Sequence, residues 1–354
     1  MKKISMFLSL VLAMSLLAGC AGTPVVYYTE CDCEKNAVTE TVTPDNTVTE
    51  LPEGAVKTGL AIIGSAADSK DAAEVAYDVT VVGVTVDDAG VIHSCIIDSV
   101  GAKVAIDAAG SITSDVNAAP ATKNELGENY GMVAYGGAKY EWFEQAAALA
   151  EYAVGKTVEE LKNGAIDETG KAPAGTDLAS TATIYLGGYV SAIEAAVANA
   201  QHLGAQAGDE LKLAVNNSVG SSKSASAEEA GLAQLDCDVT ALTVKDGVIT
   251  SCTIDSLQAK VNFDTTGAIT SDLSAPMQTK NQLGENYGMV AWAGAIAEWD
   301  EQAASFAAYV TGKTADEVAG IAVNEKTAPT EADLASSVTI AIGGFQGLVA
   351  KAMQ

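Results

Sequence analysis

The stretch Thr122–Met132, with the sequence TKNELGENYGM, recurs as TKNQLGENYGM at Thr279–Met289, 157 residues further along the chain. Ten of the eleven positions are identical. A period this long indicates that a whole folding unit was duplicated, because solenoid repeats are much shorter, at about 20–50 residues. We therefore expect two tandem domains, at residues 57–203 and 208–354.

The likeness continues on both sides of this stretch at the same spacing, to within one residue. The further matching segments are VIHSCIIDS at 91–99 with VITSCTIDS at 248–256, EWFEQAA at 141–147 with EWDEQAA at 298–304, and DLASTAT at 177–183 with DLASSVT at 333–339. Because the segments keep their order, the two halves should share one fold.

Each repeat opens with runs in which Val alternates with Thr and closes with Ala-rich runs. The first pattern is typical of strands and the second of helices. We expect strands at Leu60–Ile63, Asp78–Val86, Val91–Asp98 and Ala102–Ile106, with Leu211–Val215 opening the second repeat, and helices at Glu141–Val154 and Ile184–Ala200 with a short helix capped by Thr157 between them. The fold class is α+β: two tandem repeats, each an antiparallel sheet with packed helices.

The N-terminus has the pattern of an export signal. Two lysines precede an apolar run, Ile4–Ala18, which is too short to span a bilayer comfortably and ends in Leu-Ala-Gly-Cys20. This ending resembles the lipobox of bacterial lipoproteins, which implies cleavage of residues 1–19 and acylation of Cys20. The alternative is an ordinary signal peptide with an incidental cysteine. We expect a protein that is lipid-anchored to the extracytoplasmic face of the cell membrane.

Residues 20–56 differ in composition from both repeats. Thr, Val, Glu and Pro dominate, and no helical periodicity is present, so the segment is predicted to be a disordered, lipidated tether. Cys31 and Cys33 lie within it as Cys-Asp-Cys; they are candidates for metal binding or redox sensing, although two ligands on a flexible segment make a weak site. Cys95, Cys237 and Cys252 fall in apolar runs and are expected to be small buried side chains.

The charge of the chain excludes several classes of function. The net charge is −27, no Arg is present, and removal of residues 1–19 with their two lysines makes the net charge −29. A chain this acidic is a poor ligand for nucleic acid. With only His93 and His202, neither a His-based catalytic triad nor a multi-His zinc site is expected.

The segment DLASTAT, ending at Thr183, resembles the attachment motif of the FMN-binding domain found in membrane redox complexes and in flavin-carrying lipoproteins. The family motif is Asp-x-x-Ser/Thr-Gly-Ala-Thr, and its last Thr carries FMN through a phosphoester bond installed by a flavin transferase. The first repeat matches except that Thr181 replaces the family Gly, whereas Ser337 and Val338 depart from the motif in the second repeat. The resemblance implies covalent FMN on Thr183 and Thr339.

The other matching positions of the motif are Asp177 and Ser180 in the first repeat, and Asp333 and Ser336 in the second. They are expected to organise the attachment turn, by capping a helix or by contacting the transferase and its metal. A helix N-terminus after this turn would suit the FMN phosphate, because its free N–H groups and dipole favour anions. The alternative is that Asp-x-x-Ser is only a helix cap with polar neighbours.

The duplicated loop supplies a second set of candidate flavin contacts. Its Lys is expected near the flavin carbonyl edge or the phosphate, and its Tyr and Met against the ring. These candidates are Lys123, Tyr130 and Met132 in the first repeat and Lys280, Tyr287 and Met289 in the second, with Trp142 and Trp299 as further ring contacts. Each of these residues also has an alternative as a core or turn residue.

The resemblance covers residues 57–354 and extends to the two-domain flavin lipoproteins of Gram-positive extracellular electron transfer. It implies a non-catalytic electron carrier that passes electrons from a membrane NADH dehydrogenase and quinone pool to external acceptors such as ferric iron. The alternative is a surface-binding or adhesive lipoprotein whose duplicated domains lack flavin. An enzyme of another kind is disfavoured, since no nucleophile–base pair, metal cluster or nucleotide-binding glycine loop is recognisable.

Overall fold

The computed structural model describes residues 51–354, and the lipobox cysteine Cys20, together with Cys31 and Cys33, lies outside the described residues. Residues 51–354 form one compact unit. No helix within this range is long and apolar enough to cross a membrane.

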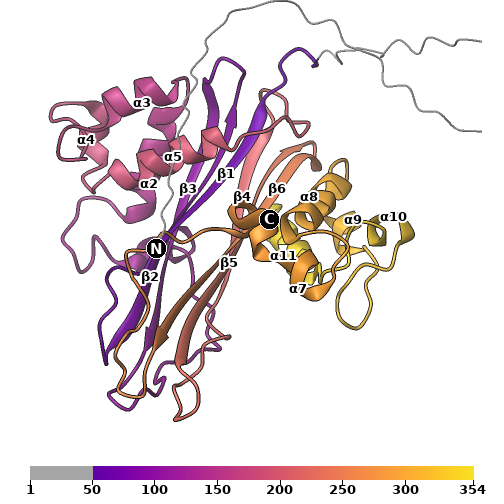
Figure 1. The fold of residues 1–354 in the computed structure, drawn as a ribbon. Coiled ribbons are helices and arrows are strands. Elements are labelled where there is room, and N and C mark those ends of the chain that lie inside the picture. Colours follow the sequence, from indigo (N-terminus) through magenta and orange to yellow (C-terminus); the bar gives the residue numbers. More distant parts are fainter. Residues whose placement is uncertain (1–50) are drawn as a thin grey trace, which may run out of the picture. The chain divides into compact units, whose positions relative to one another are not determined.

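Each repeat contains a three-stranded antiparallel sheet in which the strands follow one another in chain order (Figure 1). The strands are β1 (Lys57–Ser65), β2 (Glu74–Val86) and β3 (Ile92–Ala105) in the first repeat, and β4 (Glu210–Ser218), β5 (Gly231–Lys245) and β6 (Val248–Phe263) in the second. With helices packed on each sheet, the expected α+β class is confirmed.

The expectation of two separate strands at Val91–Asp98 and Ala102–Ile106 is wrong, because both lie in the single long strand β3. The residues between them are Ser99–Gly101. The partner strand β2 begins at Glu74, earlier than expected, and its residues Asp78–Thr80 pair with Ser99–Gly101. The ladder therefore continues without a break through Ser99–Gly101.

The helices occur in the same order in the two repeats, with one additional short helix in the second. The first repeat contains α1 (Lys123–Leu126), the 3-10 helix η1 (Gly127–Tyr130), α2 (Trp142–Ala153), α3 (Val158–Ala165), α4 (Asp177–Thr181) and α5 (Gly187–Ala198). The second contains α6 (Lys280–Leu283), the 3-10 helix η2 (Gly284–Tyr287), α7 (Met289–Ala293), α8 (Trp299–Val310), α9 (Ala315–Ala319), α10 (Ala332–Ala335) and α11 (Gly343–Ala352). Thr157 and Glu160 form the capping box expected at the start of α3.

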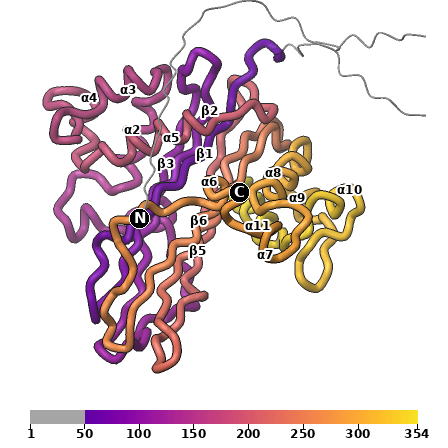
Figure 2. Tube along the Cα trace, viewed as in Figure 1, coloured from indigo at the N-terminus to yellow at the C-terminus, as the bar shows by residue number. Residues whose placement is uncertain are grey.

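The two sheets pack face to face, and the longer helices cover their outer faces (Figure 2). The central core takes Val, Leu and Ala side chains from both sheets, so the two repeats share it. Each outer core joins the opposite face of one sheet to its own helices. The predicted boundary at residues 203–208 falls between α5 and β4.

Candidate functional site

The two candidate attachment threonines occupy the same position in the two repeats. Thr183 follows α4 and precedes α5, and Thr339 lies between α10 and α11. Both residues are exposed. Both attachment candidates therefore lie at the surface of their repeat.

A buried glutamine fixes the backbone around Thr183. The side-chain Oε1 of Gln145, in α2, accepts hydrogen bonds from the Thr183 N–H at 2.8 Å, the Thr183 hydroxyl at 3.2 Å and the Ile184 N–H at 3.1 Å. The Gln145 Nε2 donates to the carbonyl of Tyr140 at 3.0 Å, and the residue is 0% exposed. The final helix begins at Gly187 and not at Ile184 as expected, and the Leu186 and Gly187 N–H groups bond instead to the Gly170 carbonyl.

Gln302 repeats this arrangement in the second repeat. Its Oε1 accepts from the Thr339 N–H at 2.8 Å, the Thr339 hydroxyl at 3.2 Å and the Ile340 N–H at 3.2 Å, and Gln302 is likewise 0% exposed. Sequence reasoning missed both glutamines. The available signal was a polar residue at the same place in two Ala-rich helices, within the matching segments Glu-Gln-Ala-Ala.

The acidic and serine positions of the motif do not cap the helix before the threonine. Thr176 is the N-cap of α4, and its side chain accepts from the Ala179 N–H. Asp177 is the first helical residue, and the Ser180 hydroxyl donates to the Asp177 carbonyl at 2.6 Å.

In the second repeat, Ser336 donates to the Asp333 carbonyl in the same way. Asp177 and Asp333 are both exposed, and neither carboxylate makes a hydrogen bond or ion pair with residues 51–354. The expectation that they cap a helix is therefore wrong, and contact with a transferase remains a prediction.

The start of α5 offers the anion-binding groups expected after the attachment turn. No side chain caps this helix, and no hydrogen-bond partner within residues 51–354 takes the first-turn N–H groups of Gly188 and Tyr189. A Cβ on Gly188 would meet nothing within 4 Å, so this edge is open. An exposed threonine four residues before an uncapped helix of 12 residues fits a phosphoester-linked FMN.

The duplicated loop of the first repeat forms a cluster around Lys123. Its Nζ lies 5.4 Å from the ring centroid of Tyr130, 5.1 Å from that of Trp142 and 3.6 Å from Asp78 Oδ1. The Trp142 Nε1 in turn donates to the Tyr189 hydroxyl at 2.9 Å. Lys123 and Tyr130 thus lie together, with Trp142 buried beside them, and their contact with a flavin remains a prediction.

Lys280 forms the corresponding cluster in the second repeat, with a different neighbour beside its tryptophan. Its Nζ lies 5.3 Å from the ring of Tyr287 and 4.6 Å from that of Trp299, which contacts Phe345 edge-on. Burial acts to lower the pKa of each lysine. At Lys123, the nearby Tyr189 and Asp78 outweigh burial, and the net effect is a raised pKa. At Lys280, burial dominates, and the pKa is lowered.

A buried glutamate holds the end of each duplicated loop. The two carboxylate oxygens of Glu141 accept from the Met132 N–H at 2.8 Å and the Val133 N–H at 2.9 Å. Glu298 holds Met289 and Val290 in the same way. The side chains of Met132 and Met289 pack against the outer cores, so the structure places them towards the protein interior.

A highly exposed aromatic side chain follows each held methionine. Tyr135 is 92% exposed and Trp292, at the matching position, is 89% exposed. The loop of Tyr135 reaches the attachment motif, because the Nζ of its Lys139 lies 3.5 Å from the Ser180 carbonyl. Sequence reasoning missed these aromatics, which lie just beyond the identical stretch.

The first turn of α2 connects all of these features. Gln145 holds Thr183, Glu141 at the N-cap holds the duplicated loop, and Trp142 faces Lys123. A cavity of about 610 Å³ beside β2 is lined by Lys123 and Tyr130, and Thr183 is not among its lining residues. The structure therefore links both candidate groups to one helical turn without enclosing them in one cavity.

The cysteines of the described range are not exposed reactive thiols. Cys237 and Cys252 are buried and Cys95 is half-buried. Burial raises the pKa of Cys95 to about 12 and that of Cys252 to about 11, which disfavours the thiolate. Within residues 51–354, no three His, Cys, Asp or Glu side chains gather in an arrangement that would hold a metal ion.

Comparison of the chain with protein-family models, with curated proteins and with solved structures found no match.

Proposed function

We propose that the protein is a membrane-anchored, extracytoplasmic electron carrier with covalent FMN on Thr183 and Thr339. Bound FMN supplies reversible one- and two-electron chemistry. The protein binds and positions the flavin and has no substrate of its own to convert.

The observation that carries this proposal is the paired attachment geometry. In each repeat, a fully buried glutamine holds the backbone of an exposed threonine in place. When the hydroxyl becomes an ester, the two backbone N–H groups keep their bonds to that glutamine. In both repeats a buried glutamine accepts hydrogen bonds from the backbone of this loop. This supports a functional role for the loop in addition to connecting two helices.

Other groups near each loop suit the parts of a flavin. The open N–H groups at the start of α5 suit the phosphate. Lys123 and Lys280 place positive charge beside aromatic rings, where it would favour a reduced, anionic flavin. Tyr135 and Trp292 offer exposed aromatic faces on which a flat ring system would stack.

The proposed path of electrons follows from the anchor and the charge. Cys20 would carry the lipid, a membrane NADH dehydrogenase and quinone pool would donate, and external acceptors such as ferric iron would receive electrons. A net charge of −27 in the whole chain favours encounter with cationic acceptors.

Intact mass spectrometry of the chain co-expressed with a flavin transferase tests the proposal. Wild-type protein should carry two FMN groups, Thr183→Val and Thr339→Val one each, and the double variant none. Thr181→Val is the matched control, because it removes a hydroxyl two residues away and should retain both flavins.

Covalent flavin on the double variant would show that the attachment residues lie elsewhere. A colourless wild-type protein in the presence of an active transferase would favour the alternative of a surface-binding or adhesive lipoprotein. In that case Tyr135 and Trp292, the most exposed large apolar side chains among residues 51–354, would be its candidate contacts.

A further inference from the structure

In the first repeat, the glutamine that holds the attachment threonine also holds a second loop. Gln145 Oε1 accepts from the Thr183 N–H at 2.8 Å, and its Nε2 donates to the Tyr140 carbonyl at 3.0 Å. Because both backbone groups bond to one amide, the two loops lie next to each other. The residue before Tyr140 is Lys139, and its Nζ lies 3.5 Å from the carbonyl of Ser180 in the attachment motif.

Lys139 places a positive charge without a counterion beside this motif. The residue is exposed and makes no ion pair with residues 51–354. Its distance to the Ser180 carbonyl is longer than the typical hydrogen-bond range of about 2.7–3.2 Å. Its Nζ also lies 4.7 Å from the ring centroid of Tyr140. The ammonium group is therefore held near the attachment loop and is free to pair with an anion there.

The second repeat has the same glutamine but no cation at this place. Gln302 joins the Thr339 N–H to the Ala297 carbonyl, and both bonds measure 2.8 Å. The residue before Ala297 is Ile296, which is 58% exposed and takes the position of Lys139. The two attachment sites therefore share their backbone hydrogen bonds and differ in charge.

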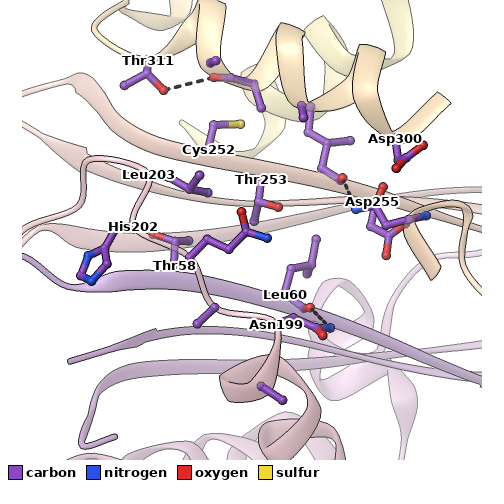
Figure 3. Close-up of a pocket in the computed structure, with 18 of the residues that line it drawn as sticks. Thr58, Leu60, Asn199, His202, Leu203, Cys252, Thr253, Asp255, Asp300 and Thr311 are labelled. Carbon is purple, nitrogen blue, oxygen red and sulfur yellow. Dashed lines mark hydrogen bonds between the residues drawn. The ribbon is translucent and has the colours of Figure 1, made fainter. Parts of the chain in front are cut away.

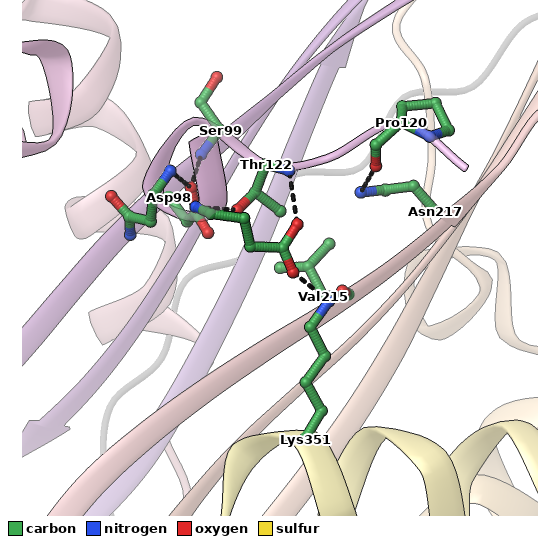
Figure 4. A network of polar contacts seen from close by, with 9 residues as sticks. Asp98, Ser99, Pro120, Thr122, Val215, Asn217 and Lys351 are labelled. Atoms are coloured by element: carbon green, nitrogen blue, oxygen red, sulfur yellow. Dashed lines mark hydrogen bonds and ion pairs between the residues drawn. The ribbon is translucent and has the colours of Figure 1, made fainter. Parts of the chain in front are cut away.

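The repeats differ at their interface as well. On one side, Lys351 of α11 pairs with Glu125 of α1 (Figure 4). On the other side, a cavity of about 790 Å³ between β1 and β6 is lined by Gln282, which takes the position of Glu125 (Figure 3). Neither Thr183 nor Thr339 lines this cavity or bonds to Lys351. The interface therefore does not determine the charge next to either threonine.

A phosphodiester on Thr183 would carry one negative charge on its phosphate. In a chain without Arg, the groups that suit this charge are lysines and free backbone N–H groups. We propose that Lys139 binds the phosphate of the FMN on Thr183, and that the site at Thr339 lacks this contact because Ile296 takes the place of the lysine. This inference rests on the proposed flavin attachment and distinguishes the two sites.

Acetylation of the full-length chain, co-expressed with a flavin transferase and analysed by peptide mass spectrometry, tests this inference. Attached FMN should slow acetylation of Lys139 about two- to fivefold, because an ammonium group paired with phosphate stays protonated and only the neutral amine reacts. Thr183→Val should lose this protection, whereas Thr339→Val should retain it. Lys162, which pairs with Glu194, is the internal reference and should react equally in all three proteins.

Phosphorus-31 NMR in a phosphorus-free detergent separates pairing with the phosphate from simple covering by the flavin. In the Thr339→Val background, the phosphodiester resonance belongs to Thr183. Lys139→Gln should shift this resonance, and the control Lys162→Gln should not. In the Thr183→Val background, Ile296→Lys should shift the remaining resonance, and the introduced lysine should be protected from acetylation.

The alternative is that Lys139 only contacts the last turn of α4. In that case, Lys139 would be acetylated at the same rate in wild type and Thr183→Val, and Lys139→Gln would leave the resonance unmoved. Either result with FMN attached overturns this inference and leaves the proposed function intact. Intact mass reports whether FMN is attached to each sample, and its absence from wild type would overturn both.

Discussion

The two repeats present the same attachment loop but surround their lysines differently. Lys123 lies between Asp78 and a tryptophan that is hydrogen-bonded to Tyr189, whereas Lys280 faces a tryptophan packed on Phe345. The duplicated repeats therefore share the buried glutamines that hold the backbone of the attachment loop, and they differ in the residues that surround the lysine. The comparison predicts that the two sites share a mechanism of loading and differ in electrostatics.

The largest effect is expected from removing the buried glutamines. Gln145→Leu should abolish flavin loading of Thr183 only, and Gln302→Leu that of Thr339 only, because each glutamine holds only its own loop. Each change leaves two backbone N–H groups without their acceptor, at a cost of about 1–3 kcal/mol per group if they stay buried. Mass spectrometry gives the loading, and urea unfolding gives the stability.

Glu151→Gln provides the control for this prediction, since it changes an exposed residue on the same helix. It should leave flavin loading unchanged and the free energy of unfolding within about 0.5 kcal/mol of that of the wild type. If Gln145→Leu reduced loading of both repeats equally, the idea of two independently held loops would fail.

The next largest effect is expected at Asp255, a buried carboxylate whose counterpart in the first repeat is Asp98. Burial raises the pKa of Asp255 to about 6, despite hydrogen bonds from Thr279, Asn281 and Ser256. The folded state therefore binds this proton more tightly than the unfolded state, and stability falls as the pH rises from about 4 to 6. The full contribution for a shift of this size is about 3 kcal/mol.

Asp255→Asn should remove this loss, so that the difference in unfolding free energy between variant and wild type changes across that pH window. Burial also raises the pKa of Asp98, the matching residue, so Asp98→Asn should change the pH dependence in the same direction. Denaturant titrations at pH 4, 5, 6 and 7 measure both. A pH-independent difference for Asp255→Asn would contradict the raised pKa.

Sequence reasoning predicted the duplication, the antiparallel sheets and the main helices, because these depend on periodic patterns and on identity between segments. It divided β3 in two, although Asp98 and Ser99 are buried within the strand and Asp98 accepts a hydrogen bond from the Asn124 N–H of the distant duplicated loop. It also missed Gln145, whose role depends on a loop 38 residues away. Periodicity reveals which face is buried, but it does not identify the partner of a buried polar group.

A smaller effect is expected from converting one lysine cluster into the other. Tyr189→Phe copies Phe345 and removes the hydrogen bond from Trp142 Nε1, at a cost of about 1 kcal/mol in unfolding free energy. If the flavin proposal holds, the reduction potential of the first site should also move towards that of the second. Potentiometric titration of single-site variants measures this, and Phe345→Tyr should shift the second site in the opposite direction.

The smallest effect is expected at the interface between the repeats. Lys351→Met removes the ion pair with Glu125 and the hydrogen bond to the Val215 carbonyl. Both charged side chains are more than a third exposed, so solvent screens the pair and its loss should cost only about 0–1 kcal/mol. Urea unfolding at low and high salt measures this contribution.

Glu125→Gln separates the ion pair from the backbone contact, because it reproduces Gln282 and leaves Lys351 free to donate to Val215. It should lower stability by less than Lys351→Met, and high salt should erase most of its effect. An equal, salt-independent loss in both variants would contradict a solvent-screened ion pair as the source of this contribution.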